Sequence, residues 1–187
     1  MKTVRGMAVA ILCMFGLCGL AQADTLTLNP PGGAISGAAG TTVGWGFTLT
    51  NVTNFAVVTS SDFCVGVITS PCSNSLGTYK DFAGPQFIVV GPSSSVTQAF
   101  NNSLLTGMGS FLINPGATGS VLGDVVLTYD LYSVSPNDPS FLPTDIVSLG
   151  NLLTAPASVT AVPEPGSLLL LASGLAGCLL AKKRLPG

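Results

Sequence analysis

The sequence predicts an all-β domain, built as a two-sheet β-sandwich, between two apolar terminal segments. Turn-forming Gly, Ser, Thr, Asn and Pro recur at short intervals over residues 24–160, and no stretch there keeps a helical period. Apolar and polar residues alternate strictly in the longest segments between these turns. Only 7% of the 187 residues are charged and 47% are hydrophobic, which favours one domain plus targeting segments.

Residues 1–23 have the three parts of a secretory signal peptide. Lys2 and Arg5 form a positively charged n-region, Met7–Leu20 is an apolar h-region, and Ala21-Gln22-Ala23 is an A-x-A cleavage site. We therefore expect a signal helix that engages the Sec translocon and is removed after Ala23 by signal peptidase. The mature chain would then begin outside the cytoplasm.

A lipoprotein is the alternative reading of this segment, since Cys13 and Cys18 lie in it. A lipidated cysteine follows a small residue, whereas Leu12 and Leu17 stand before these two. The two cysteines are therefore interpreted as apolar residues of a discarded segment.

The clearest strand is Thr41–Asn51. Val43, Trp45, Phe47 and Leu49 fall on one face and small polar residues fall on the other. Such alternation predicts one buried and one solvated face. Trp45 is in phase with its apolar neighbours, so we expect it in the core and not on a sugar-binding surface.

A second long strand is predicted over Ser120–Val134, where Val125, Leu127 and Tyr129 alternate with polar residues. Together with shorter candidates this gives about nine strands, enough for two sheets packed face to face. The shorter candidates are Thr25–Leu28, Phe55–Thr59, Phe63–Thr69, Gln86–Val90, Val96–Phe100, Asp145–Leu149 and Ser158–Val162.

The segment Gly40–Asn51 places a glycine-containing turn before the pattern Val-x-aromatic-x-Phe-x-Leu-x-Asn. This pattern resembles one found in immunoglobulin-like sandwiches of bacterial surface proteins. The resemblance implies an immunoglobulin-like β-sandwich over residues 24–160, but a fold of this kind does not specify a function.

Cys64 and Cys72 are the only cysteines of the predicted domain. In an oxidising compartment, two cysteines eight positions apart predict a local disulfide. A redox or metal site is the alternative, but the spacing is not C-x-x-C and the chain has no histidine to assist.

The charge distribution excludes nucleic acid as a partner. Residues 24–165 hold eight acidic residues against Lys80, a net charge of −7, and such a surface repels phosphate. The absence of histidine excludes His-dependent catalytic triads and His-ligated zinc.

Few residues could support catalysis. Asp124 and Asp130 lie six positions apart on one strand, roughly 20 Å, which is too far for a pair of glycosidase carboxylates. Lys80, expected in a loop beside Asp81, is the only lysine available for a Ser–Lys dyad. Asp138 and Asp145 could contribute to a calcium site, although no D-x-D-x-D-G loop is present. We therefore expect a protein that is not an enzyme and that needs no cofactor or metal.

The C-terminal segment 161–187 has three unlike parts. Val162-Pro163-Glu164-Pro165 must stay extended, because proline fixes φ and provides no backbone donor. Residues 167–181 are almost wholly apolar and predict a single transmembrane helix; Leu168–Ala181 would cover roughly 20 Å, short of a roughly 30 Å hydrocarbon core. Lys182, Lys183 and Arg184 would hold the tail on the cytoplasmic side.

This order of motif, short helix and basic cluster resembles the PEP-CTERM sorting signal of bacteria. The resemblance implies that an exosortase recognises Val162–Pro165 and cleaves near it, after the inner membrane has served as a transient anchor. An ordinary membrane anchor with two prolines in its linker is the alternative. Members of the family often accompany exopolysaccharide and biofilm systems, so the resemblance implies delivery to the cell surface or the extracellular matrix.

Three functions follow as hypotheses. The first is a noncatalytic exported surface or matrix protein, associated with exopolysaccharide. The second is a carbohydrate-binding or adhesin module, which needs an exposed aromatic side chain or a calcium loop. The third is a small hydrolase, which the missing histidine disfavours.

Overall fold

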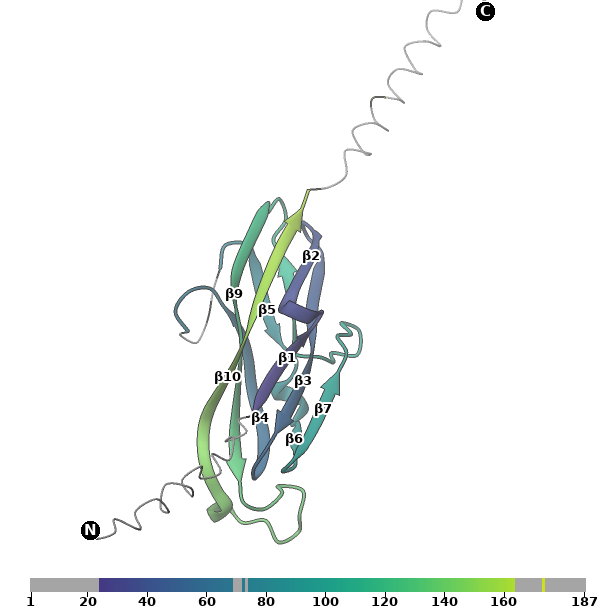
Figure 1. The fold of residues 1–187 in the computed structure, drawn as a ribbon. Coiled ribbons are helices and arrows are strands. Elements are labelled where there is room, and N and C mark those ends of the chain that lie inside the picture. The colour runs from purple at the N-terminus through teal and green to yellow at the C-terminus, as the bar shows by residue number, and fades with distance from the viewer. Residues whose placement is uncertain (1–23, 69–71, 73, 164–172, 174–187) are drawn as a thin grey trace, which may run out of the picture.

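The computed structural model describes residues 24–68, 72, 74–163 and 173, and these residues form an elongated body of two β-sheets (Figure 1). Ten strands make up the sheets, joined by turns and by three short 3₁₀ segments, η1 (Pro31–Gly33), η2 (Gly84–Gln86) and η3 (Pro143–Asp145). The strands are β1 (Thr25–Asn29), β2 (Ala34–Ala38), β3 (Thr42–Asn51), β4 (Phe55–Cys64), β5 (Gly77–Asp81), β6 (Val89–Val90), β7 (Ser94–Gln98), β8 (Gly109–Ile113), β9 (Gly119–Tyr132) and β10 (Ile146–Val162).

The first sheet has the order β1-β3-β8-β5, and β7 also pairs with β3. All of its pairs are antiparallel. Strand β3 is central because it pairs with β8 over its first half, with β7 over its second half, and with β1.

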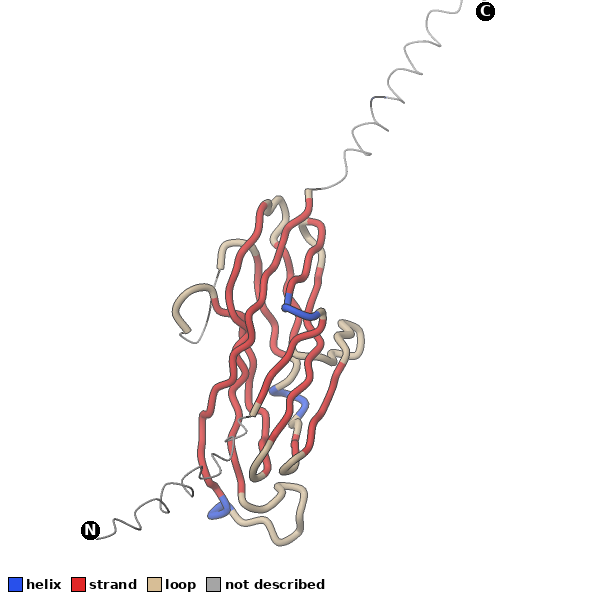
Figure 2. Tube along the Cα trace, in the orientation of Figure 1, coloured by secondary structure: helices blue, strands red, loops and turns tan. Residues whose placement is uncertain are grey.

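The second sheet has the order β2-β10-β9-β4-β6. Its longest strands are β9 and β10, of 14 and 17 residues, which run along the length of the body (Figure 2). Strand β2 pairs with the end of β10 in parallel, whereas the other pairs are antiparallel. Since β1 belongs to the first sheet and β2 to the second, the chain passes between sheets at η1.

The core forms where the apolar faces of the two sheets meet. Trp45 and Phe47 of β3 are fully buried against a cluster that includes Val125 and Leu127 of β9, so the predicted phase of both long strands is confirmed. The indole Nε1 of Trp45 donates to the Gly33 carbonyl at 2.7 Å, which satisfies its polar atom inside the core.

The opposite face of β3 was expected to be solvated, and this prediction is wrong for its middle. Gly44 and Gly46 are buried there, and a Cβ atom added to Gly44 would collide with the Phe100 ring. Glycine is needed at this position because an aromatic side chain from the segment after β7 covers the strand.

Three strands were not predicted: β2, β5 and β8. Each has five residues, and their sequences AISGA, GTYKD and GSFLI lack a full alternation of apolar and polar residues. Lys80 therefore lies in a strand, where a loop was expected.

Other predicted boundaries also change. The predicted strands Phe55–Thr59 and Phe63–Thr69 are joined in β4, which ends at Cys64; Gly66 follows with a φ of 80° that breaks the extended backbone. The predicted strands Asp145–Leu149 and Ser158–Val162 are two parts of β10. The predicted strand Gln86–Val90 shortens to Val89–Val90, since η2 and a left-handed Phe87 precede it.

Within the described part of the chain, no helix has both the length and the apolar character needed to span a bilayer. The predicted transmembrane helix 167–181 lies outside the described residues except for Ser173, and the predicted signal helix 1–23 lies outside them entirely.

Candidate functional site

The sorting motif begins at the last residue of strand β10. Val162 pairs with Ala38 of β2, and Ala161 pairs with Gly119 of β9. Ala161 is 2% exposed, whereas Val162 is 44% exposed and Pro163 is exposed as well. The chain therefore leaves the body at Val162 in an extended conformation, with its side chain open to solvent.

Hydrogen bonds fix the end of the body from which the motif leaves. The Gly40 amide donates to Ile113 O at 3.0 Å, and Thr41 Oγ1 donates to Ala38 O at 2.7 Å. Beside β10, Ser120 Oγ lies 2.8 Å from Thr160 Oγ1. The strand that carries the motif is thus supported by β2 on one side and by β9 on the other.

Most of the predicted sorting and processing residues lie outside the described part of the chain. Val162 and Pro163 are described. The remaining predicted residues, which the structure does not describe, are Ala21, Ala23, Glu164, Pro165, Lys182, Lys183 and Arg184.

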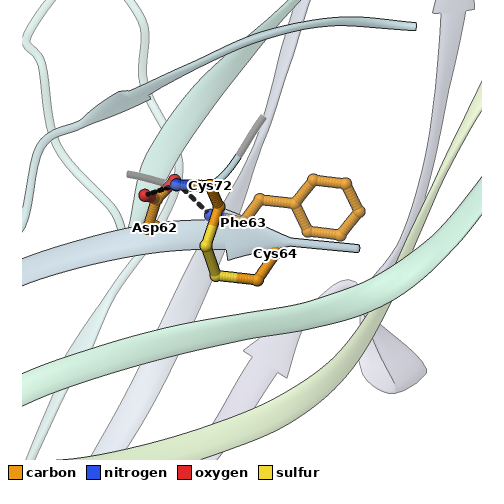
Figure 3. The surroundings of a disulfide bond; sticks show 4 residues. All are labelled: Asp62, Phe63, Cys64 and Cys72. Carbon is orange, nitrogen blue, oxygen red and sulfur yellow. Dashed lines mark hydrogen bonds between the residues drawn. A yellow bond between two sulfur atoms is a disulfide. The ribbon is translucent and has the colours of Figure 1, made fainter. Parts of the chain in front are cut away.

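The predicted disulfide joins Cys64 at the end of β4 to Cys72, with Cα atoms 4.9 Å apart (Figure 3). Asp62 holds both ends of this loop. Its Oδ1 accepts from the Phe63 amide at 2.8 Å and its Oδ2 accepts from the Cys72 amide at 3.0 Å. Since β4 and β5 belong to different sheets, the bridge fixes the start of a connection between the sheets.

Metal-binding groups are rare among the described residues. The only group of three potential ligands within 4.8 Å there is Asp62, Cys64 and Cys72, and the disulfide occupies both sulfurs. Asp138 and Asp145, the calcium candidates, accept hydrogen bonds within their own loop, from Ser140 and Leu142. The Ser140 hydroxyl and amide lower the pKa of Asp138.

A buried polar cluster lies between the sheets that the sequence did not indicate. Ser61 Oγ lies 2.8 Å from Tyr79 Oη and 2.5 Å from Asp81 Oδ1, and burial raises the pKa of Tyr79. The Lys80 ammonium lies 5.8 Å from the centroid of the Phe82 ring. Ser61 is hydrogen-bonded to Asp81 and Tyr79, and this geometry favours a role in stability.

Asp24, the first residue after the predicted cleavage site, is part of the folded body. Its Oδ1 accepts from the Val52 amide at 2.9 Å, and its Oδ2 accepts from the Tyr129 hydroxyl at 2.9 Å. Burial and this hydrogen bond raise the pKa of Tyr129 to about 12. The sequence gives no signal for this contact, which spans 105 positions.

Among the described residues, the aromatic side chain exposed to solvent is that of Phe87, not that of Trp45. Trp45 is fully buried, as predicted, whereas Phe87 is 57% exposed and has a left-handed φ of 51°. Leu104 and Leu105 are exposed too, and Gln86 Nε2 donates to the Leu105 carbonyl at 2.6 Å. The sequence missed this apolar surface because Phe87 was placed inside a predicted strand.

Comparison with known proteins identifies the C-terminal segment. Residues 161–184 match the model of the PEP-CTERM protein-sorting motif, so the match begins inside strand β10. No curated protein matches the chain. The chain therefore carries a PEP-CTERM protein-sorting motif, which marks it as an exported, cell-surface-sorted substrate of an exosortase.

Proposed function

We propose that this protein is a noncatalytic component of the cell surface or extracellular matrix, released there by exosortase processing next to its folded domain. The observation that carries the proposal is the position of the motif. Val162 is the last residue of β10, and Pro163 follows it in solvent. A motif that begins where the folded body ends is accessible to the cleft of another protein.

An immunoglobulin-like topology is part of the proposal. The orders β1-β3-β8-β5 and β10-β9-β4 correspond to the A-B-E-D and G-F-C sheets of immunoglobulin domains. The corresponding strands also follow one another in the same chain order, with β2, β6 and β7 as additions. Such a sandwich is a stable scaffold for surface loops, and the fold by itself does not imply a catalytic activity.

The described carboxylates support a noncatalytic role. Asp124 and Asp130 lie six positions apart on β9, and Asp24, Asp62 and Asp81 accept hydrogen bonds from the body itself. These groups contribute to stability and to a net negative surface. A disulfide is typical of an oxidising compartment. The disulfide and the negative surface are both consistent with a stable extracellular protein associated with exopolysaccharide.

The test replaces Pro163-Glu164-Pro165 with three alanines in cells that contain an exosortase. A matched control replaces Asn137-Asp138-Pro139, an exposed loop segment that also holds one acid and proline. We expect the first variant to accumulate as a membrane-bound form with an intact tail, and the control to be processed normally. Mass spectrometry of the C-terminus is the measurement, and release of the first variant at the normal rate would refute the proposal.

Carbohydrate binding is the second candidate function, and exposed Phe87 favours it. Aromatic rings provide an apolar face for sugar rings, and Gln86, the residue before Phe87, donates to the carbonyl of exposed Leu105. A panel of polysaccharides, with and without calcium, should then bind the wild-type protein and not the Phe87→Ala variant. Equal binding by both proteins would exclude Phe87 as the site.

A further inference from the structure

The first half of strand β10 is apolar but exposed to solvent. Ile146, Val147, Leu149 and Leu152 are 44%, 51%, 60% and 54% exposed. Successive residues of a strand point to opposite faces, so the exposure of both Ile146 and Val147 means that neither face of the strand is buried where it begins. Exposed apolar side chains gathered in one segment are typical of an interaction site.

The same half of β10 is an open edge of the second sheet. Within the described part of the chain, β9 is the only strand that pairs with residues 146–157, because β2 pairs with β10 from Ser158 to Val162 only (Figure 1). A further strand at this edge would continue the line of β2. The structure therefore has room beside β10 for a strand that the described residues do not supply.

Backbone groups of β10 are directed toward this open edge. From Asn151 onward the register with β9 is unbroken, so alternate residues direct their N–H and C=O groups away from β9. Pro156 is one of these residues, since it has no N–H and its carbonyl oxygen lies beside Gly33, on the side of β2. Leu152 and Thr154 face the same way, and each offers one donor and one acceptor to a further strand.

No charged side chain protects this edge. Proteins usually block an open edge with lysine or another charge, and the edge strand β5 of the first sheet carries Lys80 and Asp81. Residues 146–162 include no charged residue. The partner that fits this edge is therefore an extended, uncharged and apolar strand.

We propose that the open half of β10 pairs with the same segment of a second copy of this chain, antiparallel about a twofold axis. One such contact gives both copies an uncharged, apolar partner strand and closes the assembly at two chains. Pairing about the middle of the segment places Leu149 of one copy near Leu152 of the other, and the two second sheets become one continuous sheet. The inference goes beyond the proposed function and does not depend on it.

The charge distribution is compatible with this contact. Residues 24–165 hold eight acidic residues against one basic residue, so two copies repel one another over most of their surface. Asp130 of β9 lies next to the open segment, where its Oδ1 accepts from the Gly150 amide at 2.8 Å. In the continuous sheet the Asp130 residues of the two copies are three strand spacings apart, about 14 Å, which exceeds a Debye length of about 8 Å. The Asp145 residues lie at opposite ends of the paired segment.

The test is cross-linking of the full chain in a mild nonionic detergent, with Cys13→Ala, Cys18→Ala and Cys178→Ala so that only an introduced thiol reacts. A short bismaleimide is applied to Leu152→Cys at the open edge, or to Leu122→Cys, an exposed position on β9 of the same sheet. We expect cross-linked dimers and no larger species for Leu152→Cys, and monomers for Leu122→Cys. Both variants carry the same tail, so association through the tail would cross-link them alike. Equal cross-linking at both positions, a ladder of larger species, or no cross-linking of Leu152→Cys would overturn the proposal.

Charge variants test whether the dimer forms through the edge. In the Leu152→Cys chain, Leu149→Lys should abolish the dimer because a lysine on an edge strand opposes strand addition, whereas Leu122→Lys should leave it unchanged. Both leucines are exposed, at 60% and 77%, so neither change opens a cavity in the core, and far-ultraviolet circular dichroism checks the fold of each variant. Dimers that persist in the Leu149→Lys chain would contradict the proposal. If Leu152→Cys cross-links to a different protein in the producing cells and not to itself, the edge binds that protein and the proposal fails.

Discussion

The Asp24 carboxylate accepts a hydrogen bond from the Tyr129 hydroxyl at 2.9 Å, joining the start of the described chain to strand β9 across 105 positions. The other carboxylate oxygen accepts from the Val52 amide. One side chain thus connects the segment before β1, the turn after β3, and β9 of the other sheet. If the signal peptide is cleaved after Ala23, the first mature residue stabilises the fold.

Asp24→Ala should destabilise the domain by about 1–3 kcal/mol, because hydrogen bonds to a charged acceptor are lost and the Tyr129 hydroxyl is left without its partner. Urea unfolding measures the change. Combining Asp24→Ala with Tyr129→Phe should cost less than the sum of the single changes. Asp138→Ala is the control, and it should change stability much less because its hydrogen bonds stay within one exposed loop. Additive effects of the Asp24 and Tyr129 substitutions would contradict the Asp24–Tyr129 hydrogen bond.

The stability of the protein should fall at alkaline pH in a way that depends on Tyr129. Its pKa is raised from 10.0 to about 12 in the folded state, so the folded chain retains the phenol proton longer than the unfolded chain. The contribution of the protonated Tyr129 to folding stability is complete below pH 10 and is lost as the pH rises through about 12. The stability advantage of the wild-type chain over Tyr129→Phe should narrow over that interval in urea unfolding, and a constant difference would contradict the assignment.

Removal of the disulfide should lower stability without changing the fold. Cys64→Ser with Cys72→Ser opens a small loop, for which the chain-entropy model predicts a loss of about 2–3 kcal/mol. Far-ultraviolet circular dichroism should keep the β signal, while urea unfolding shifts to lower concentration. Reduction of the wild-type protein should give a similar shift; a reduced wild-type protein as stable as the oxidised one would refute this role.

Asn51 should be intolerant of a negative charge. It is fully buried, and its Nδ2 donates to the carbonyl oxygens of Asn54, Val90 and Gly91 at 2.8–3.0 Å. Asn51→Asp replaces this donor with an acceptor and leaves an uncompensated buried charge, which costs about 3–5 kcal/mol. Thermal unfolding provides the measurement, and Asn137→Asp at an exposed position is the control that should have little effect. Equal melting temperatures for the wild-type protein and Asn51→Asp would contradict the assigned hydrogen bonds of the Asn51 amide.

Periodicity predicted the long strands because their inner faces are largely apolar. In β3 around Trp45 and in β9 around Leu127, a buried apolar residue occurs at every second position. The alternation of apolar and polar residues is therefore visible in the sequence. Short strands such as β5 and β8 were missed because five residues with glycine and serine carry too little pattern. Ser61 lies between the predicted strands Phe55–Thr59 and Phe63–Thr69 and was assigned to neither, whereas a strand can bury a serine when Tyr79 and Asp81 satisfy its hydroxyl.

The sequence alone determined the all-β class, the Cys64–Cys72 pair and the sorting motif, because strand periodicity, cysteine number and a contiguous motif are local properties of the chain. Only the tertiary structure decided that Val162 closes β10 beside β2 and that Asp24 bonds Tyr129. These are relationships between segments distant in sequence, and they depend on the register in which the strands of two sheets pair and pack.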